Sequence, residues 1–185
     1  GGSAADAATA MAFALSVTMP SSASLGGGGV CIVRDGQKGL PVVIDFLPQA
    51  PAEVAPGTER PSAVPAMPRG LFLLHSRYGK LKWEQVMTPA ENLARFGYSV
   101  PRAFAVQFDK VKDALLRDVE ASKVFRKADG NPIGEGDFLV QPQLAGTLSL
   151  LRRQGVGELY VGQGAANLVA AVARAGGSLV TQDLR

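Results

Sequence analysis

The sequence offers one histidine and one cysteine as a base or a nucleophile. His75 lies in an apolar stretch with no nucleophile motif beside it, and a general base acts only on a group within hydrogen-bond reach. Cys31 lies within an apolar run, where a thiol behaves as a small hydrophobic side chain. A single imidazole excludes metal sites that need two, and a single thiol excludes an internal disulfide framework. We therefore interpret both residues as structural and predict neither a metal site nor a cofactor.

The unbroken glycine run at residues 26–29 raises the question of a phosphate-binding loop. Such loops follow a strand and open a helix. Here the glycines follow a predicted helix and enter an apolar run, and no Gly-Lys-Ser/Thr sequence occurs. The run therefore predicts close backbone packing or positive φ angles. Asp45, at the end of the second apolar run, likewise favours a turn contact over catalysis.

The composition is that of an ordinary globular domain. Of the 185 residues, 46% are hydrophobic and 19% are charged, which is enough to bury one core without disulfides. Lys and Arg number 19 against 16 Asp and Glu, and a net charge of +3 is too small to predict binding to nucleic acid or an anionic membrane. The basic pairs at residues 126–127 and 152–153 are interpreted as solvated charges. The apolar stretch at residues 7–17 is shorter than the ~20 residues that cross a bilayer, so no membrane span is predicted.

The elements that would position these residues begin with a helix and a hairpin. Ser3 and Asp6 have the S-x-x-D spacing of a capping box, and the alanines that follow predict a buried helix over residues 4–17. Two β-branched runs, at residues 30–33 and 42–46, flank an Asp-Gly turn and predict a β-hairpin. Their continuous apolar character indicates that both faces of the hairpin are covered.

Prolines and glycines divide the rest of the chain. Five prolines between residues 51 and 69 predict an irregular connection, and the pattern becomes helical from Gly70 onward. Pro89 is expected to start a new helical segment. The predicted fold class is α+β, with a helix–hairpin unit at 1–50, the proline-rich connection at 51–69 and a helical part at 70–185. The other expected helix boundaries are ends at Gly79, Gly97 and Gly155, starts at Pro101 and Pro142, and a final helix over residues 157–175.

Short motifs along the chain resemble those of the γ-glutamyltransferase family in order and spacing. The first are Gly1-Gly-Ser-Ala-Ala-Asp-Ala-Ala8, Gly26-Gly-Gly-Gly29, and Ile44-Asp-Phe46 with Ala50-Pro51. The others are Arg77-Tyr78-Gly79, Pro89-Ala90, Leu93-Ala94 with Gly97, Leu139-Val140-Gln141, Leu144-Ala145, Leu159-Tyr-Val-Gly162, and Gly176-Gly177 with Thr181, Asp183 and Leu184. Single matches are trivial, but together they cover nearly the whole chain in the correct order.

The resemblance implies an N-terminal-nucleophile hydrolase. In that family a longer precursor cleaves itself into a large and a small subunit, which together form an αββα sandwich. The new N-terminal Thr of the small subunit attacks the γ-glutamyl amide, and its α-amino group serves as the base. Residues 1–185 are then expected to be a single incomplete domain, the N-terminal part of the large subunit and a fragment of the precursor. They would hold part of the sandwich, a buried helix plus a β-hairpin, followed by a mostly helical region.

The resemblance also implies the partners. They are the remainder of the large subunit, the small subunit, and a small-molecule γ-glutamyl or acyl amide substrate, without nucleic acid, metal or cofactor. Apolar surface left by the missing parts is expected to promote self-association of the isolated fragment. Family members occur in the bacterial periplasm and in the cytoplasm, so the compartment stays open.

Two departures from the family pattern concern catalysis and binding. No threonine lies in a Thr-Thr-His nucleophile motif, so we expect this chain to hold no catalytic residue and to be inactive alone. The family motif Asp-Phe-Arg-Glu, whose Arg clamps the α-carboxylate of the substrate, here reads Asp45-Phe46-Leu47-Pro48. Leu47 has neither charge nor donor and is the candidate substrate-binding position at which acyl specificity differs. The threonines are Thr9, Thr18, Thr58, Thr88, Thr147 and Thr181.

Three hypotheses for the complete protein follow. The first is an enzyme that hydrolyses or transfers the acyl group of γ-glutamyl amides such as glutathione. The second is an acylase or amidohydrolase with altered acyl specificity, because Leu47 replaces the family's arginine. The third is a non-catalytic relative that keeps the fold and binds a ligand or a partner.

Overall fold

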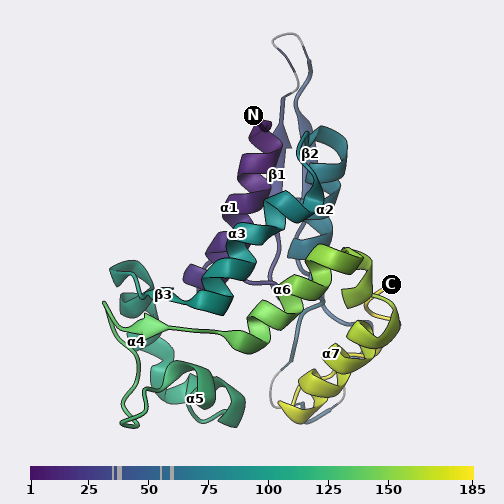
Figure 1. Ribbon diagram of the computed structural model, residues 1–185. Coiled ribbons are helices and arrows are strands. Elements are labelled where there is room, and N and C mark those ends of the chain that lie inside the picture. The colour runs from purple at the N-terminus through teal and green to yellow at the C-terminus, as the bar shows by residue number, and fades with distance from the viewer. Residues whose placement is uncertain (35, 37–38, 55, 59–60) are drawn as a thin grey trace.

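The computed structural model describes residues 1–34, 36, 39–54, 56–58 and 61–185. Helices dominate the described residues, and the strands form two short antiparallel pairs (Figure 1). The fold is therefore mixed helix and sheet, as the sequence predicts. In chain order the elements are α1 (Ala4–Thr18), β1 (Gly29–Val33), β2 (Val42–Phe46), α2 (Met67–Tyr78), α3 (Trp83–Phe96), β3 (Tyr98–Ser99), α4 (Arg102–Leu115), α5 (Val119–Phe125), β4 (Phe138–Leu139), α6 (Pro142–Gln154), the 3₁₀ helix η1 (Val156–Leu159) and α7 (Gly162–Arg174).

Helix α1 begins with the predicted capping box. The Ser3 hydroxyl accepts a hydrogen bond from the Asp6 amide at 3.2 Å, and the Asp6 carboxylate accepts one from the Ser3 amide at 2.6 Å. The small side chains of α1 let it pack against both α2 and α3. Phe13 and Val17 are fully buried there. The predicted helix is confirmed; it is buried toward α2 and α3, whereas Met11 is 62% exposed.

Strands β1 and β2 form the predicted antiparallel hairpin, with Ile32 opposite Val43. One face packs on α2, where Ile44 is buried. On the other face Ile32 is 73% exposed and Val43 is 60% exposed. The prediction that both faces are covered is therefore wrong for the described residues, since only one face has a helix against it. The predicted Asp-Gly turn lies partly outside the described residues.

The proline-rich connection is shorter than predicted. The Val64 amide donates to the Gln49 carbonyl at 2.8 Å and brings the two ends of the loop together. Helix α2 already begins at Met67, with Pro68 in its first turn. A proline is tolerated there because the first amides of a helix have no partner within the helix.

Helix α3 passes through Pro89 without interruption, so the prediction of a new segment at this residue is wrong. Pro89 lacks the amide that would bond to the Gln85 carbonyl. Both residues are solvent-exposed, so water can bond to that carbonyl.

The predicted final helix is interrupted, and one helix was missed. Residues 156–159 form η1, and α7 begins only at Gly162, which has φ = +80°. The Glu158 carboxylate accepts the Gly164 amide at 3.0 Å and caps the new helix. Helix α5, which the sequence analysis did not predict, begins with a side-chain cap from Asp118.

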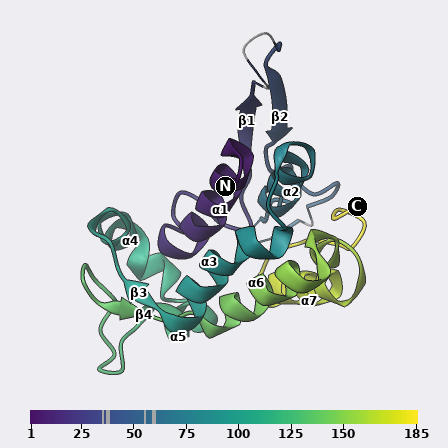
Figure 2. The ribbon, with the colours of Figure 1, turned by 45° about the horizontal axis from the view of Figure 1, so that its top comes forward.

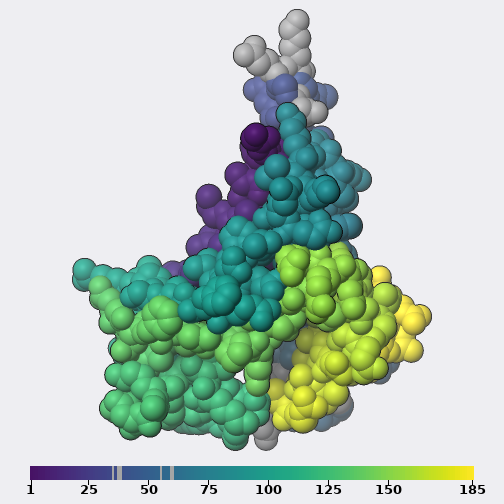
Figure 3. All heavy atoms as spheres, viewed as in Figure 1, coloured from purple at the N-terminus to yellow at the C-terminus, as the bar shows by residue number. Residues whose placement is uncertain are grey.

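The helices α3 and α6 lie side by side at the centre of the molecule (Figure 2). Glu91 of α3 is 6% exposed and accepts hydrogen bonds from Arg95 at 2.8 Å and from Arg152 of α6 at 2.6 Å. Arg152 is thus not the solvated charge that the sequence analysis expected. Figure 3 shows the hairpin rising beyond the helices, with α4–α5 and α7 on opposite sides of the base. Among the described helices, none is both long and apolar enough to cross a membrane.

Candidate functional site

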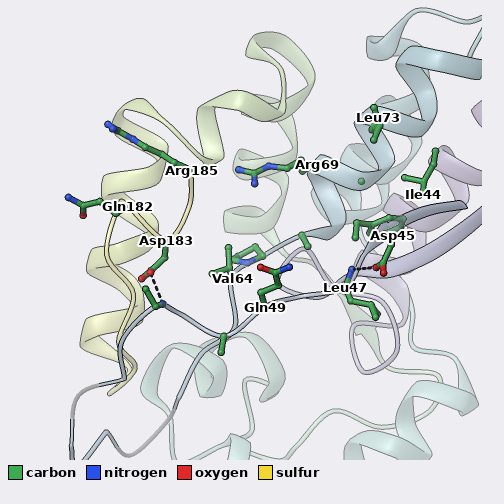
Figure 4. Close-up of a pocket in the computed structure, with 16 residues that line it drawn as sticks. Ile44, Asp45, Leu47, Gln49, Val64, Arg69, Leu73, Gln182, Asp183 and Arg185 are labelled. Atoms are coloured by element: carbon green, nitrogen blue, oxygen red, sulfur yellow. Dashed lines mark hydrogen bonds between the residues drawn. The ribbon is translucent and has the colours of Figure 1, made fainter.

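A pocket of about 630 Å³ opens where β2 ends (Figure 4). The end of β2, the loop that follows it, the first turn of α2 and the last residues of the chain enclose it. Its polar and charged side chains come from all of these segments, so the pocket depends on contacts between residues far apart in sequence. The lining includes Asp45, Leu47, Gln49, Val64, Arg69, Leu73, Gln182, Asp183 and Arg185.

Leu47 lines this pocket at the first position after Phe46, where β2 stops. The Asp45 carboxylate accepts a hydrogen bond from the Leu47 amide at 3.0 Å, which is the turn contact that the sequence predicts for Asp45. The Leu47 side chain is 56% exposed. Leu47 therefore presents an apolar side chain to the pocket beside the Asp45 carboxylate.

Two glycines allow the chain to pack closely around this strand end. A Cβ on Gly28 would overlap the Phe46 carbonyl, and a Cβ on Gly70 would overlap the Phe46 ring. Close packing, one of the two predictions for the glycine run at 26–29, is thus confirmed at Gly28. The alternative prediction, positive φ, is wrong for all four glycines of the run.

The charged groups of the pocket differ in the contacts that they form within the protein. The Asp183 carboxylate accepts the Val180 amide at 2.9 Å and the Ala52 amide at 3.0 Å, and these two bonds hold its pKa below the usual value. Arg69 stacks on the Tyr160 ring at 4.0 Å from the ring centroid and donates to the Leu184 carbonyl. Asp183 thus acts as a structural bond acceptor, whereas Arg69 brings a cation to the pocket.

His75 and Cys31 lie outside this pocket. The His75 Nε2 lies 3.0 Å from the Leu81 carbonyl and 3.3 Å from the Asp6 carboxylate, and its ring packs edge-on against Trp83. Cys31 is half-buried in β1, and burial raises the pKa of its thiol. The contacts of both residues are therefore with the surrounding helices, strands and loops and not with the pocket. No group of three or more His, Cys, Asp or Glu residues that could hold a metal ion occurs among the described residues.

Leu47, the candidate that the sequence predicts, lines the pocket, and so does Arg69, which no sequence pattern predicts. Arg69 lies between Pro68 and Gly70 at the edge of the proline-rich connection, in no motif that indicates binding. The only local signal was a basic residue placed in the first turn of a helix, and that turn was predicted to be irregular. Its neighbours Tyr160 and Leu184 are distant in sequence, so their contacts with Arg69 could not be predicted from local patterns.

A helix and hairpin followed by a mostly helical region match solved N-terminal-nucleophile hydrolases along the whole chain. The crystal structure of Helicobacter pylori gamma-glutamyltranspeptidase matches 100% of this chain and 57% of its own, with a TM-score of 0.90 and 30% identity. That of cephalosporin acylase from Bacillus halodurans matches 100% of this chain and 38% of its own, with a TM-score of 0.83 and 27% identity. The chain therefore has the fold of the N-terminal-nucleophile hydrolases along residues 1–185.

The sequence comparisons narrow the class to a family. The model of the family described as gamma-glutamyltranspeptidase matches residues 1–185, and the chain belongs to this family. The glutathione hydrolase proenzyme of Escherichia coli is 32% identical over 200 residues, which cover 100% of this chain. The chain spans 34% of that relative, about a third of its length.

Proposed function

We propose that the complete protein containing this chain hydrolyses or transfers the acyl group of γ-glutamyl amides such as glutathione. The family match over all of residues 1–185 is the observation that carries this proposal. The pocket at the end of β2 supports it, because its volume of about 630 Å³ is within the range of small-molecule sites. The Escherichia coli relative is a glutathione hydrolase proenzyme, which supports the same substrate class for this protein.

In this proposal the chain shapes the acyl site and another part of the protein performs the attack. The nucleophile is the N-terminal Thr of a small subunit outside residues 1–185, and its amino group takes the proton of its hydroxyl. Residues of this chain bind and orient the acyl group: Leu47 provides an apolar wall, and Asp45 fixes the strand end by bonding to the Leu47 amide. Without the nucleophile the chain has no activity, because orientation alone supplies no attacking group.

Turnover of a γ-glutamyl anilide by the complete, processed protein tests this function. We expect release of the aniline and acceleration by an acceptor dipeptide, which separates transfer from hydrolysis. Replacing the N-terminal Thr of the small subunit by Ala is the matched control and abolishes release. A processed protein that turns over neither the γ-glutamyl anilide nor any simple acyl anilide would instead indicate a non-catalytic relative.

A second function, an acylase with altered acyl specificity, is favoured by Leu47. A leucine cannot form the charge-assisted hydrogen bonds that an arginine gives a carboxylate. The likeness to a cephalosporin acylase, at 27% identity, is compatible with this function. Comparing γ-glutamyl, 4-aminobutyryl and butyryl anilides distinguishes the two, since the last two lack the α-carboxylate.

A further inference from the structure

Arg69 brings a positive charge to the pocket that Leu47 also lines. It lies in the first turn of α2, whereas Leu47 follows β2, and both side chains line the same space (Figure 4). In Figure 4 the Arg69 side chain extends from α2 toward the C-terminal segment that carries Arg185. A ligand bound in this pocket beside Leu47 therefore shares the space with a guanidinium group.

The position of the guanidinium is fixed by two contacts. Its carbon lies 4.0 Å from the centroid of the Tyr160 ring, a cation–π geometry, and one of its nitrogens donates to the Leu184 carbonyl. The Tyr160 hydroxyl also accepts the Arg69 amide at 3.3 Å, so Tyr160 holds both ends of the residue. An arginine held in place loses less side-chain entropy when it binds a ligand.

The charge of Arg69 is not neutralised by a carboxylate that the structure describes. No ion pair joins Arg69 to a described Asp or Glu. The two carboxylates of the pocket have other partners: Asp45 bonds to the Leu47 amide, and Asp183 bonds to the Ala52 and Val180 amides. Tyr160 stays neutral at physiological pH, because burial raises the pKa of its phenol. The guanidinium therefore has N–H donors available for an anion.

We propose that Arg69 binds the carboxylate of the acyl group and thereby replaces, from α2, the cation that is absent at Leu47. The inference rests on the proposed function and specifies its substrate class: acyl groups that carry a carboxylate. A planar guanidinium can bind a carboxylate through two parallel hydrogen bonds, which a lysine cannot do. Arg69 is thus a specificity-determining residue, whereas Leu47 limits the space around the aliphatic part of the acyl chain.

The test compares glutaryl anilide with butyryl anilide, which differ only in the terminal carboxylate. In the complete protein, Arg69→Leu lowers the kcat/KM ratio of glutaryl over butyryl substrate about 10- to 100-fold. Turnover of butyryl anilide stays within about threefold, which shows that the variant is folded. Arg69→Lys recovers part of the ratio. Arg77→Leu, the same substitution on the exposed surface of α2, is the matched control and leaves the ratio unchanged.

Binding of glutarate, measured by calorimetry on the complete protein, tests the inference without turnover. Arg69→Leu is expected to weaken this binding at least about tenfold, whereas Arg77→Leu does not change it. Failure of the wild type to bind glutarate, or equal binding by wild type and Arg69→Leu, overturns the inference. If the complete protein turns over neither γ-glutamyl anilide nor these two anilides, the proposed function fails, and glutarate binding still decides the role of Arg69. If butyryl anilide is turned over and Arg69→Leu does not change the ratio, the inference fails alone.

Discussion

At the residue scale, Asp6 connects more of the structure than its motif predicts. Its carboxylate caps α1 through Ser3 and also accepts the Lys80 amide at 3.0 Å and the Leu81 amide at 3.3 Å. Asp6 is 3% exposed. Burial by itself raises the pKa of this carboxyl, but the hydrogen bonds from Ser3, Lys80 and Leu81 outweigh burial and lower it to about 2. Asp6 therefore ties α1 to the loop between α2 and α3.

The lowered pKa of Asp6 gives a pH-dependent stability with a definite sign. The ionised form is favoured in the folded state, so the contribution is present above the ordinary value of 3.8 and is lost as the pH falls toward about 2. A shift of this size corresponds to about 2 kcal/mol. We expect Asp6→Asn to lower the free energy of unfolding of the complete protein by about that amount at pH 7.

The difference between wild type and Asp6→Asn should shrink between pH 4 and pH 2. Denaturant titrations at a series of pH values measure it. Asp113→Asn, on an exposed position of α4, is the control and should change stability by less than about 0.5 kcal/mol. A difference that stays constant down to pH 2 would contradict the role of the ionised carboxylate.

Leu47 leads to a second prediction at this scale, for substrate choice. In the Arg69→Leu background, Leu47→Arg places a guanidinium at the end of β2, where a carboxylate would otherwise lose water without gaining a partner. The kcat/KM ratio of γ-glutamyl over 4-aminobutyryl anilide should rise about 10- to 100-fold. Leu47→Met keeps the apolar wall and is expected to leave the ratio unchanged. An unchanged ratio in Leu47→Arg would show that the acyl carboxylate lies away from the strand end.

At the scale of elements, local signals predicted α1, the hairpin and the start of α6. The capping box of Ser3 and Asp6 and the helix-starting Pro142 each act within one turn of a helix, so the sequence alone reveals them. The continuity of α3 through Pro89 depends on solvent, and the stack of Arg69 on Tyr160 depends on residues distant in sequence. Single-sequence patterns contain no information on such contacts. The same reasoning applies to Glu91, whose partner Arg152 was expected to be solvated.

The ion pair between Glu91 of α3 and Arg152 of α6 contributes to the free energy of unfolding by an amount that can be measured. Burial raises the pKa of the Glu91 carboxyl, but the bonds from Arg152 and Arg95 outweigh it and lower the pKa. Arg152→Met leaves a buried carboxylate without its interhelical partner and should destabilise the complete protein by about 2 to 3 kcal/mol. Arg95→Met should cost less than about 1 kcal/mol, because the Arg95 side chain is 48% exposed.

This contribution to stability is measured from the denaturation midpoints of three variants. They are Arg152→Met, Arg95→Met, and Arg152→Met combined with Glu91→Gln. Removing the charge of Glu91 together with that of Arg152 should recover part of the loss. Equal destabilisation by Arg95→Met and Arg152→Met would show that α3 and α6 do not depend on the buried ion pair.

At the scale of the whole molecule, the hairpin presents an apolar face that no described element covers. Ile32, Val43 and Val30 are 73%, 60% and 50% exposed on neighbouring positions of the two strands. A face of this kind is typical of a surface that another part of a protein covers. We propose that the remaining part of the large subunit and the small subunit cover it.

The isolated chain of residues 1–185 should therefore self-associate or bind a hydrophobic dye, whereas the complete protein should do neither at this face. Light scattering over a range of concentrations, with dye fluorescence, measures both. Replacing Ile32 and Val43 by Thr should reduce the effect, because threonine keeps β-propensity while removing apolar area. A strictly monomeric wild-type chain that binds no dye would contradict the expectation.

The most direct test of this chain's role is the site at which a reactive γ-glutamyl analogue becomes attached. The complete, processed protein is labelled with the analogue, digested and examined by mass spectrometry. We expect the adduct only on the N-terminal Thr of the small subunit and none on any peptide from residues 1–185, because in the proposed function this chain shapes the acyl pocket and the small subunit supplies the nucleophile. An adduct on a side chain within residues 1–185, formed in proportion to the loss of activity, would contradict this division of roles.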